Sequence, residues 1–272
     1  MEDSKESKPK EEAPKTFFLK LLSKIPPLLP YNEEIIKDIL LKKDKFTNHG
    51  KIDCEREYNL LNAMFIIKGK IYEVEEPLSF FPIVYLTTKI SDKIMYEYRN
   101  KKVNERLSQL IYFSSASAAT KFEIQYYIPF SFFEDISESI VTAKEVKIFE
   151  DQIYKIFDFD LNIIYPTDVL YLYQMADNTT ENKELTFYCR FLIIFLLFSK
   201  SFIEKDKNLV VLTAYYYAKI VFEKKMIWSL DLQFLSGIEK KTIIKNLKEL
   251  NKEIKENQKI YNYLGEHFSE II

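Results

Sequence analysis

The stretch that decides the fold is SSASAATKFE, residues 114–123. Small side chains on every side let neighbouring helices approach closely, so residues 114–119 predict the central helix of a bundle. This helix ends in Lys121-Phe122-Glu123, and a second amphipathic helix carries Glu150 and ends at Phe159-Asp160-Leu161. The pattern predicts one lysine and one glutamate at the edge of an apolar groove, a surface suited to holding a helix of another protein.

On both sides of this stretch, from about residue 56 onward, the sequence has helical periodicity, with Pro and Asn residues at helix starts. We expect helices over about 56–71, 77–90, 104–122, 131–136 and 142–157, and again over 166–175, 182–200, 207–223, 229–236 and 239–257. The two halves are similar: AATKFE followed by FFEDIS matches AKIVFE followed by QFLSGI about 100 residues later. Duplication of a five-helix unit, without strand alternation, predicts an all-α chain of two tandem five-helix bundles.

The chain before the first bundle reads differently. Residues 1–15 are charged and lack aromatic residues, which is typical of a disordered tail. From Tyr31, the run YNEEIIKDIL places Ile35 and other isoleucines on one face of a short helix, with Asn32 as its N-cap. We therefore predict a disordered or irregular tail over 1–30, a first bundle with its preceding helix over 31–161, and a second bundle with a C-terminal helix over 162–272.

Composition excludes several classes of protein. A hydrophobic content of 47% with 29% charged residues is a soluble globular balance, and a net charge of -2 makes nucleic acid a weak default partner. Four glycines argue against all-β folds and glycine-rich phosphate loops. The chain has only two cysteines, Cys54 and Cys189, which lie far apart in helical contexts, so a disulfide framework is not indicated and a reducing compartment fits. The apolar run 187–198 holds Arg190 and is too short for a membrane span, so we predict a buried core helix.

An enzyme is not indicated. The two histidines, His49 and His267, lie far apart, and no metal-ligand spacing, nucleophile elbow or P-loop is present. Asp158 and Asp160, at a helix exit, are typical of capping rather than acid–base chemistry. We expect no catalytic residue, no metal or other cofactor, no small-molecule substrate and no membrane partner.

Several segments resemble the cyclin family, and the resemblance covers about residues 31–270. TKFE resembles the SKYEE or SKFEE end of the third cyclin-box helix, and FEDQIYKIFDFDL resembles MEHLVLKVLTFDL, the fifth helix and its exit. YNEEIIKDIL resembles the YAEEIHEYL run of A- and B-type cyclins, and NLVVLTAYYYAKIVF resembles a helix of the second box. The chain thus looks like a divergent cyclin, nearest the A/B type, with two cyclin boxes.

The resemblance implies a role for each matching residue. In the family, the residues at Lys121 and Glu150 form an ion pair and hold the backbone of the kinase's regulatory helix. Phe122, Tyr154, Phe159 and Leu161, with Ala118 as floor and Ile35 beside them, match the residues that contact an apolar side chain of that helix. The implied protein is a non-catalytic subunit that activates a cyclin-dependent kinase in a heterodimer, acts in the cell cycle and cell division, and is nuclear and cytoplasmic in a eukaryotic cell.

Departures from the family pattern leave other readings open. The first-box tryptophan is absent, since the single tryptophan is Trp228, and Tyr58, Asn59 and Asn62 make a poor docking patch for Arg-x-Leu substrates. The alternatives are a transcription-type cyclin paired with a polymerase-directed kinase, and a cyclin-fold general transcription factor that binds nucleic acid. The YNEEI run argues against the first, and the near-neutral charge with the Lys121/Glu150 pair argues against the second.

Overall fold

The computed structural model describes residues 39–40, 80–100, 103–124, 128–199, 201–224 and 226–269. Every regular element in these ranges is a helix, which confirms the predicted all-α class. The helices are α4 (Phe80–Glu97), α5 (Glu105–Ile124), α6 (Phe130–Ile136), α7 (Ala143–Ile156), α8 (Pro166–Ala176), α9 (Lys183–Leu196), α10 (Lys207–Glu223), α11 (Leu230–Ser236), α12 (Lys240–Glu256) and α13 (Gln258–Ser269). The helix expected over 56–71, and the one expected from Tyr31 apart from residues 39–40, lie outside the described residues.

Most helix ends lie close to their predicted positions. Many helix starts are marked in the sequence by a residue whose side chain caps the helix. The Asn104 side chain accepts a hydrogen bond from the Leu107 amide at 2.9 Å and starts α5. The main error is in α4, which runs to Glu97 instead of ending near Ile90. Ile94 lies one turn beyond Ile90 and is also fully buried, so the apolar face of this helix continues past the predicted end.

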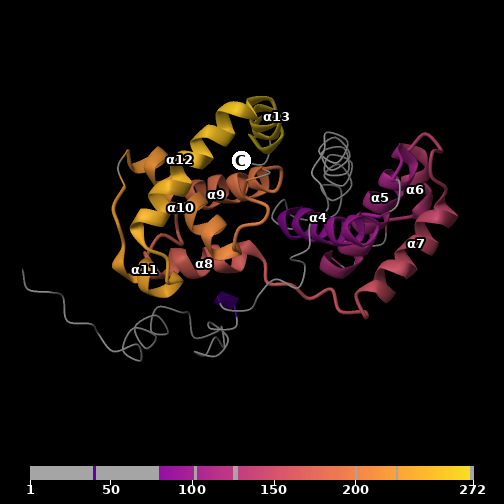
Figure 1. Ribbon diagram of the computed structural model, residues 1–272, viewed down its shortest axis with the longest axis horizontal. Helices are drawn as coiled ribbons and strands as arrows, with labels where there is room; N and C mark the ends of the chain where they lie inside the picture. The colour runs from indigo at the N-terminus through magenta and orange to yellow at the C-terminus, as the bar shows by residue number, and fades with distance from the viewer. Residues whose placement is uncertain are drawn as a thin grey trace, which may run out of the picture.

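In the first bundle, α5 packs against both α4 and α7, and α6 packs against α7. Figure 1 shows these four helices grouped apart from α8 to α12. Residues 114–119 of α5 are all buried, as predicted for a central helix. Since serine and alanine bring little volume, α4 and α7 can lie close to the α5 backbone on both sides.

In the second bundle, α10 is the central helix and packs against α8, α9 and α12. The α13 helix returns to contact α9. Residues 191–198, in and just after α9, are all buried, so the apolar run is a core helix as predicted, and Cys189 is a buried free thiol. None of the helices in the described ranges has the length and apolar character needed to cross a membrane.

The two bundles meet where α4 packs against α9. The Phe81 and Phe187 rings meet edge to face at 6.4 Å, and the Arg190 guanidinium lies 5.6 Å from the Phe81 ring centroid. At the start of α8, the Tyr165 hydroxyl donates a hydrogen bond to Glu123 at the end of α5. The same Tyr165 ring contacts Tyr85 of α4 edge to face at 6.0 Å. Tyr165 therefore ties the second bundle to two helices of the first.

Candidate protein-binding surface

Lys121 and Glu150 meet at the end of α5. The Lys121 Nζ lies 2.7 Å from Glu150 Oε1 and 3.0 Å from Oε2. Ser117, one turn before Lys121 on the same face of α5, donates a hydrogen bond to Glu150 Oε2 at 2.5 Å. The Glu150 side chain is only 5% exposed, whereas that of Lys121 is 27% exposed. The Lys121 side chain is therefore partly exposed to solvent, and the buried Glu150 carboxylate fixes its position.

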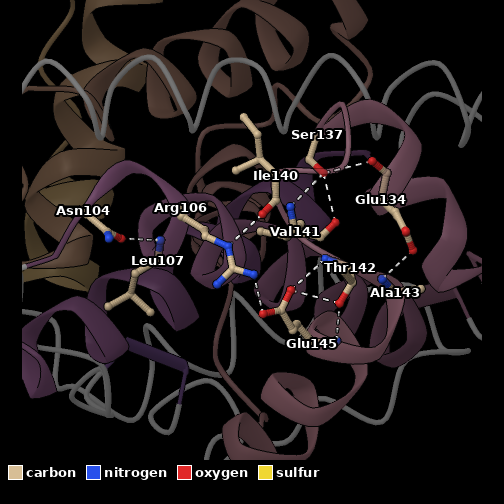
Figure 2. Close-up of polar contacts among 10 residues, drawn as sticks. All are labelled: Asn104, Arg106, Leu107, Glu134, Ser137, Ile140, Val141, Thr142, Ala143 and Glu145. Atoms are coloured by element: carbon tan, nitrogen blue, oxygen red, sulfur yellow. Dashed lines mark hydrogen bonds and ion pairs between the residues drawn. The ribbon is translucent and has the colours of Figure 1, made fainter.

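The start of α7 fixes the position of Glu150 along that helix. Thr142 and Glu145 form a capping box, in which the Thr142 hydroxyl accepts from the Glu145 amide and the Glu145 carboxylate accepts from the Thr142 amide at 2.9 Å. Arg106, near the start of α5, donates to Glu145 at 2.6 Å and to the Ile140 carbonyl at 2.9 Å, as Figure 2 shows. These contacts tie α7 to α5 at the end opposite Lys121.

The turn before α7 is also held by side chains (Figure 2). The Glu134 carboxylate of α6 accepts from the Ala143 amide at 2.8 Å, and the Ser137 hydroxyl bonds to the backbone of Val141. The first-turn amides of α7 therefore have partners from the preceding helix as well as from the cap. This support fixes where α7 begins and so where Glu150 lies.

Two aromatic groups flank the ion pair. The Phe130 ring of α6 lies 4.4 Å from Lys121 Nζ, a cation–π distance. At the exit of α7, the Tyr154 and Phe159 rings stack with centroids 6.1 Å apart and an interplanar angle of 2°. Phe159 is 74% exposed and Phe122 41% exposed, so both present apolar surface to solvent. Aromatic side chains are enriched at protein-binding surfaces, so the exposed Phe122 and Phe159 rings suit such a surface.

Phe159 takes its place from the way α7 ends. Asp158 and Phe159 both have left-handed backbone conformations, with φ of 50° and 57°. The Phe159 amide bonds to the Tyr154 carbonyl at 2.8 Å, and the Asp158 amide to the Lys155 carbonyl at 3.3 Å. This is a Schellman motif, and the Tyr154–Phe159 stack is the apolar contact that accompanies it.

The remaining predicted site residues lie elsewhere. Ala118 and Leu161 are buried, so they support the surface from within the bundle and do not line it. Ile35, expected beside the groove, and Tyr58, Asn59 and Asn62, expected in the docking patch, lie outside the described residues.

Burial and neighbouring charge shift two groups at this end of the bundle. Partial burial and the nearby Glu150 carboxylate raise the pKa of Tyr154 to about 12. Burial also raises the pKa of Glu123, while its hydrogen bond from Tyr165 opposes that rise. In the described ranges, no group of three or more His, Cys, Asp or Glu side chains is placed to hold a metal ion.

Sequence reasoning missed Ser117 and Phe130. Ser117 could have been found, because it lies four residues before Lys121 and therefore on the same helix face. Phe130 follows a proline and comes from α6, so its contact with Lys121 depends on tertiary packing that no local pattern shows. A partly exposed lysine held by a buried carboxylate can offer hydrogen bonds to the backbone carbonyls at a helix end of another protein.

Comparison with known proteins supports the cyclin resemblance. Residues 164–269 match the family model described as cyclin, C-terminal domain. The structure is similar to the X-ray structure of a viral cyclin from herpesvirus saimiri, with a TM-score of 0.62 and 16% sequence identity, over 82% of this chain and 96% of the viral one. No curated protein sequence matches the chain. Residues 164–269 are therefore similar to the C-terminal domain of cyclins, and the described helices have the fold of a viral cyclin.

Proposed function

We propose that this protein is a non-catalytic regulatory subunit that binds a cyclin-dependent kinase and holds its regulatory helix in the active position. The match of residues 164–269 to the cyclin C-terminal domain supports a regulatory role. The observation that carries the proposal is the Lys121–Glu150 pair, in which a buried carboxylate holds a partly exposed lysine at the end of α5. Such a pair presents a fixed positive charge, and a fixed donor loses little side-chain entropy when a partner binds.

In this proposal, the ion pair and the neighbouring aromatic residues make different contacts with the kinase helix. Lys121 would donate to carbonyl groups of the kinase helix, while Phe122, Tyr154 and Phe159 would contact an apolar side chain of that helix. Ala118 and Leu161, which are buried, would keep α5 and the α7 exit in position behind this surface. In this proposal the surface belongs to the domain over 31–161, and residues 162–272 form the second domain.

The proposed mechanism is conformational. In the active kinase, its own lysine–glutamate pair is formed, and this requires the regulatory helix to lie inward. A subunit that binds only the inward helix shifts the kinase toward the active state by its difference in affinity for the two positions. A shift from 1% to 99% active requires a preference of about 10,000-fold. We further propose a role in the cell cycle and a nuclear and cytoplasmic location, because the resemblance is nearest to A- and B-type cyclins.

Co-expression with the cyclin-dependent kinases of the same organism tests the proposal. We expect a stable 1:1 complex with at least one of them by size-exclusion chromatography, and higher activity of that kinase on a protein substrate in the complex. For a variant that removes the Lys121 side chain, Lys147→Ala is the matched control, because Lys147 is an exposed lysine of α7 that is not part of the Lys121–Glu150 pair. If no kinase co-elutes with the chain, or if a kinase binds and its activity does not rise, the proposal is wrong.

A further inference from the structure

α12 in the second bundle separates its charges by face. Its core face consists of Ile243, Asn246, Leu247 and Leu250, all buried. Five exposed lysines follow one another at intervals of four, three, four and three residues: Lys241, Lys245, Lys248, Lys252 and Lys255. This spacing places them in one row along the helix. The row spans fourteen residue steps, or about 21 Å at 1.5 Å per residue.

Two of the three glutamates of α12, Glu249 and Glu253, contact another part of the fold. Glu249 forms an ion pair with Lys205 at 2.6 Å, and Glu253 accepts a hydrogen bond from Ser201 at 2.6 Å. Both contacts join α12 to the segment between α9 and α10. These two carboxylates are therefore used inside the fold, although Glu249 lies four residues from Lys245 and could have paired with it on the surface.

The lysine row is only partly neutralised. Lys241 pairs with Glu239 at 2.7 Å, and Lys252 lies 3.5 Å from Glu256. In the described part of the chain, no salt bridge joins Lys245, Lys248 or Lys255 to a carboxylate, although the charge of Lys245 contributes to the lowered pKa of Glu249. Like charges three or four residues apart repel one another and destabilise a helix. The chain as a whole has a net charge of only -2, so this row is a local concentration of one sign. On a solvent-facing helix it lowers the stability of the fold instead of adding to it.

We propose that this row binds an acidic α-helix of a partner protein. A partner helix with Glu or Asp at the same alternating intervals presents its carboxylates at the same spacing along its axis, so the charges match in register. Ile244, which is partly exposed next to this row, offers an apolar contact between the two helices. The row contains neither arginine, which would bind phosphate in bidentate fashion, nor an aromatic residue for base stacking, so a helix fits it better than a nucleic acid does.

This inference does not depend on the proposed kinase binding. The row lies on α12 of the second bundle, whereas Lys121 and Glu150 lie on α5 and α7 of the first (Figure 1). Loss of one surface should leave the other intact.

The test uses the full chain and a labelled helical peptide that carries four glutamates at intervals of four, three and four residues. A second peptide with glutamine at those positions is its control. We expect the glutamate peptide to bind in a fluorescence anisotropy titration. The triple variant Lys245→Gln/Lys248→Gln/Lys252→Gln should weaken that binding roughly tenfold or more, because three ion pairs are lost together.

A charge-matched triple, Lys144→Gln/Lys147→Gln/Lys183→Gln, changes three exposed lysines outside α12 and should leave the affinity within about twofold. All six positions are exposed, so circular dichroism should show both variants folded. The proposal is overturned if the glutamine peptide binds equally well, or if the matched triple loses as much affinity as the α12 triple. A single-stranded oligonucleotide that binds α12 more tightly than the glutamate peptide does would instead assign the row to nucleic acid.

Discussion

Glu150 illustrates what one side chain contributes to the surface. Its carboxylate is buried and has two partners on α5, Ser117 and Lys121. Removal of Lys121 would leave this buried carboxylate with one of the three hydrogen bonds that it accepts from α5. Leaving a buried charge without its partner costs more free energy than the intact pair contributes relative to two apolar groups. The geometry of the pair therefore depends on both members.

We expect Lys121→Ala and Glu150→Ala each to weaken kinase binding by about 2 kcal/mol, because each leaves its partner unpaired. The double variant should lose less than the sum of the single losses, since the two residues act as a unit. Isothermal titration of the four proteins against the kinase measures this coupling. Additive losses would show that the two residues act independently and would contradict the proposed pair.

Glu123 predicts a pH dependence of stability. Burial raises its pKa above the reference value of 4.5, so the folded protein holds this proton more tightly than the unfolded chain does. Above pH 4.5 the folded state therefore binds more protons, and stability falls as pH rises through the raised pKa. Glu123→Gln removes this loss and can still accept the Tyr165 hydroxyl. Its gain in unfolding free energy over the wild type should grow between pH 4.5 and neutral pH, as measured by urea denaturation. Parallel pH profiles for the two proteins would refute this.

At the scale of elements, several of the described helices end with a residue other than glycine in the left-handed backbone region, which glycine favours, and three of these ends are Schellman motifs. α6, α7 and α8 are followed by Glu138, Asp158 and Asn178, with φ of 50°, 50° and 55°. Each end has the paired backbone hydrogen bonds of a Schellman motif. A side chain in the left-handed region costs free energy that glycine avoids, and asparagine tolerates that region better than most residues do.

Asp158→Gly should therefore stabilise the protein by roughly 0.5–1 kcal/mol, because it removes this backbone strain. Asn178→Gly is the matched comparison and should gain less. Thermal unfolding followed by circular dichroism measures both. If Asp158→Gly destabilises the chain, the Asp158 side chain has a structural role that outweighs its backbone strain.

Thr142→Ala should lower the free energy of unfolding by about 1 kcal/mol, because the first turn of α7 loses its capping hydroxyl. Thr142→Ser keeps that hydroxyl and should stay close to the wild type. Urea denaturation of the three proteins is the measurement. Equal losses in the serine and alanine variants would mean that the methyl group of Thr142, and not its hydroxyl, stabilises the α7 start.

The helices were predictable because their signals are local. Asn104 and Pro166 mark helix starts, and residues 114–119 mark a central helix by size alone. The end of α4 was harder, because its apolar face continues past Ile90 to the buried Ile94. The Lys121–Glu150 pair was expected only through the family resemblance, since partners 29 residues apart leave no local pattern.

At the scale of the whole molecule, a few side chains near the ends of helices join the two bundles. Tyr165 contacts α4 and α5, and Asn208 at the start of α10 donates to the Leu40 carbonyl at 2.6 Å. Leu40 is buried and belongs to the hydrophobic core. Leu40 therefore contacts the second bundle, while Tyr165 joins that bundle to α4 and α5, which carries Lys121 of the proposed kinase-binding surface.

The position of Trp228 has an optical consequence. Its indole stacks on Tyr216 at 5.1 Å and donates to Gln233, so its surroundings belong to the second bundle alone. Because the sequence contains one tryptophan, selective excitation of indole fluorescence reports the melting of that bundle, while far-ultraviolet circular dichroism averages over every helix. Coincident denaturation curves from the two signals would indicate one cooperative unit, and separated curves would give each bundle its own midpoint.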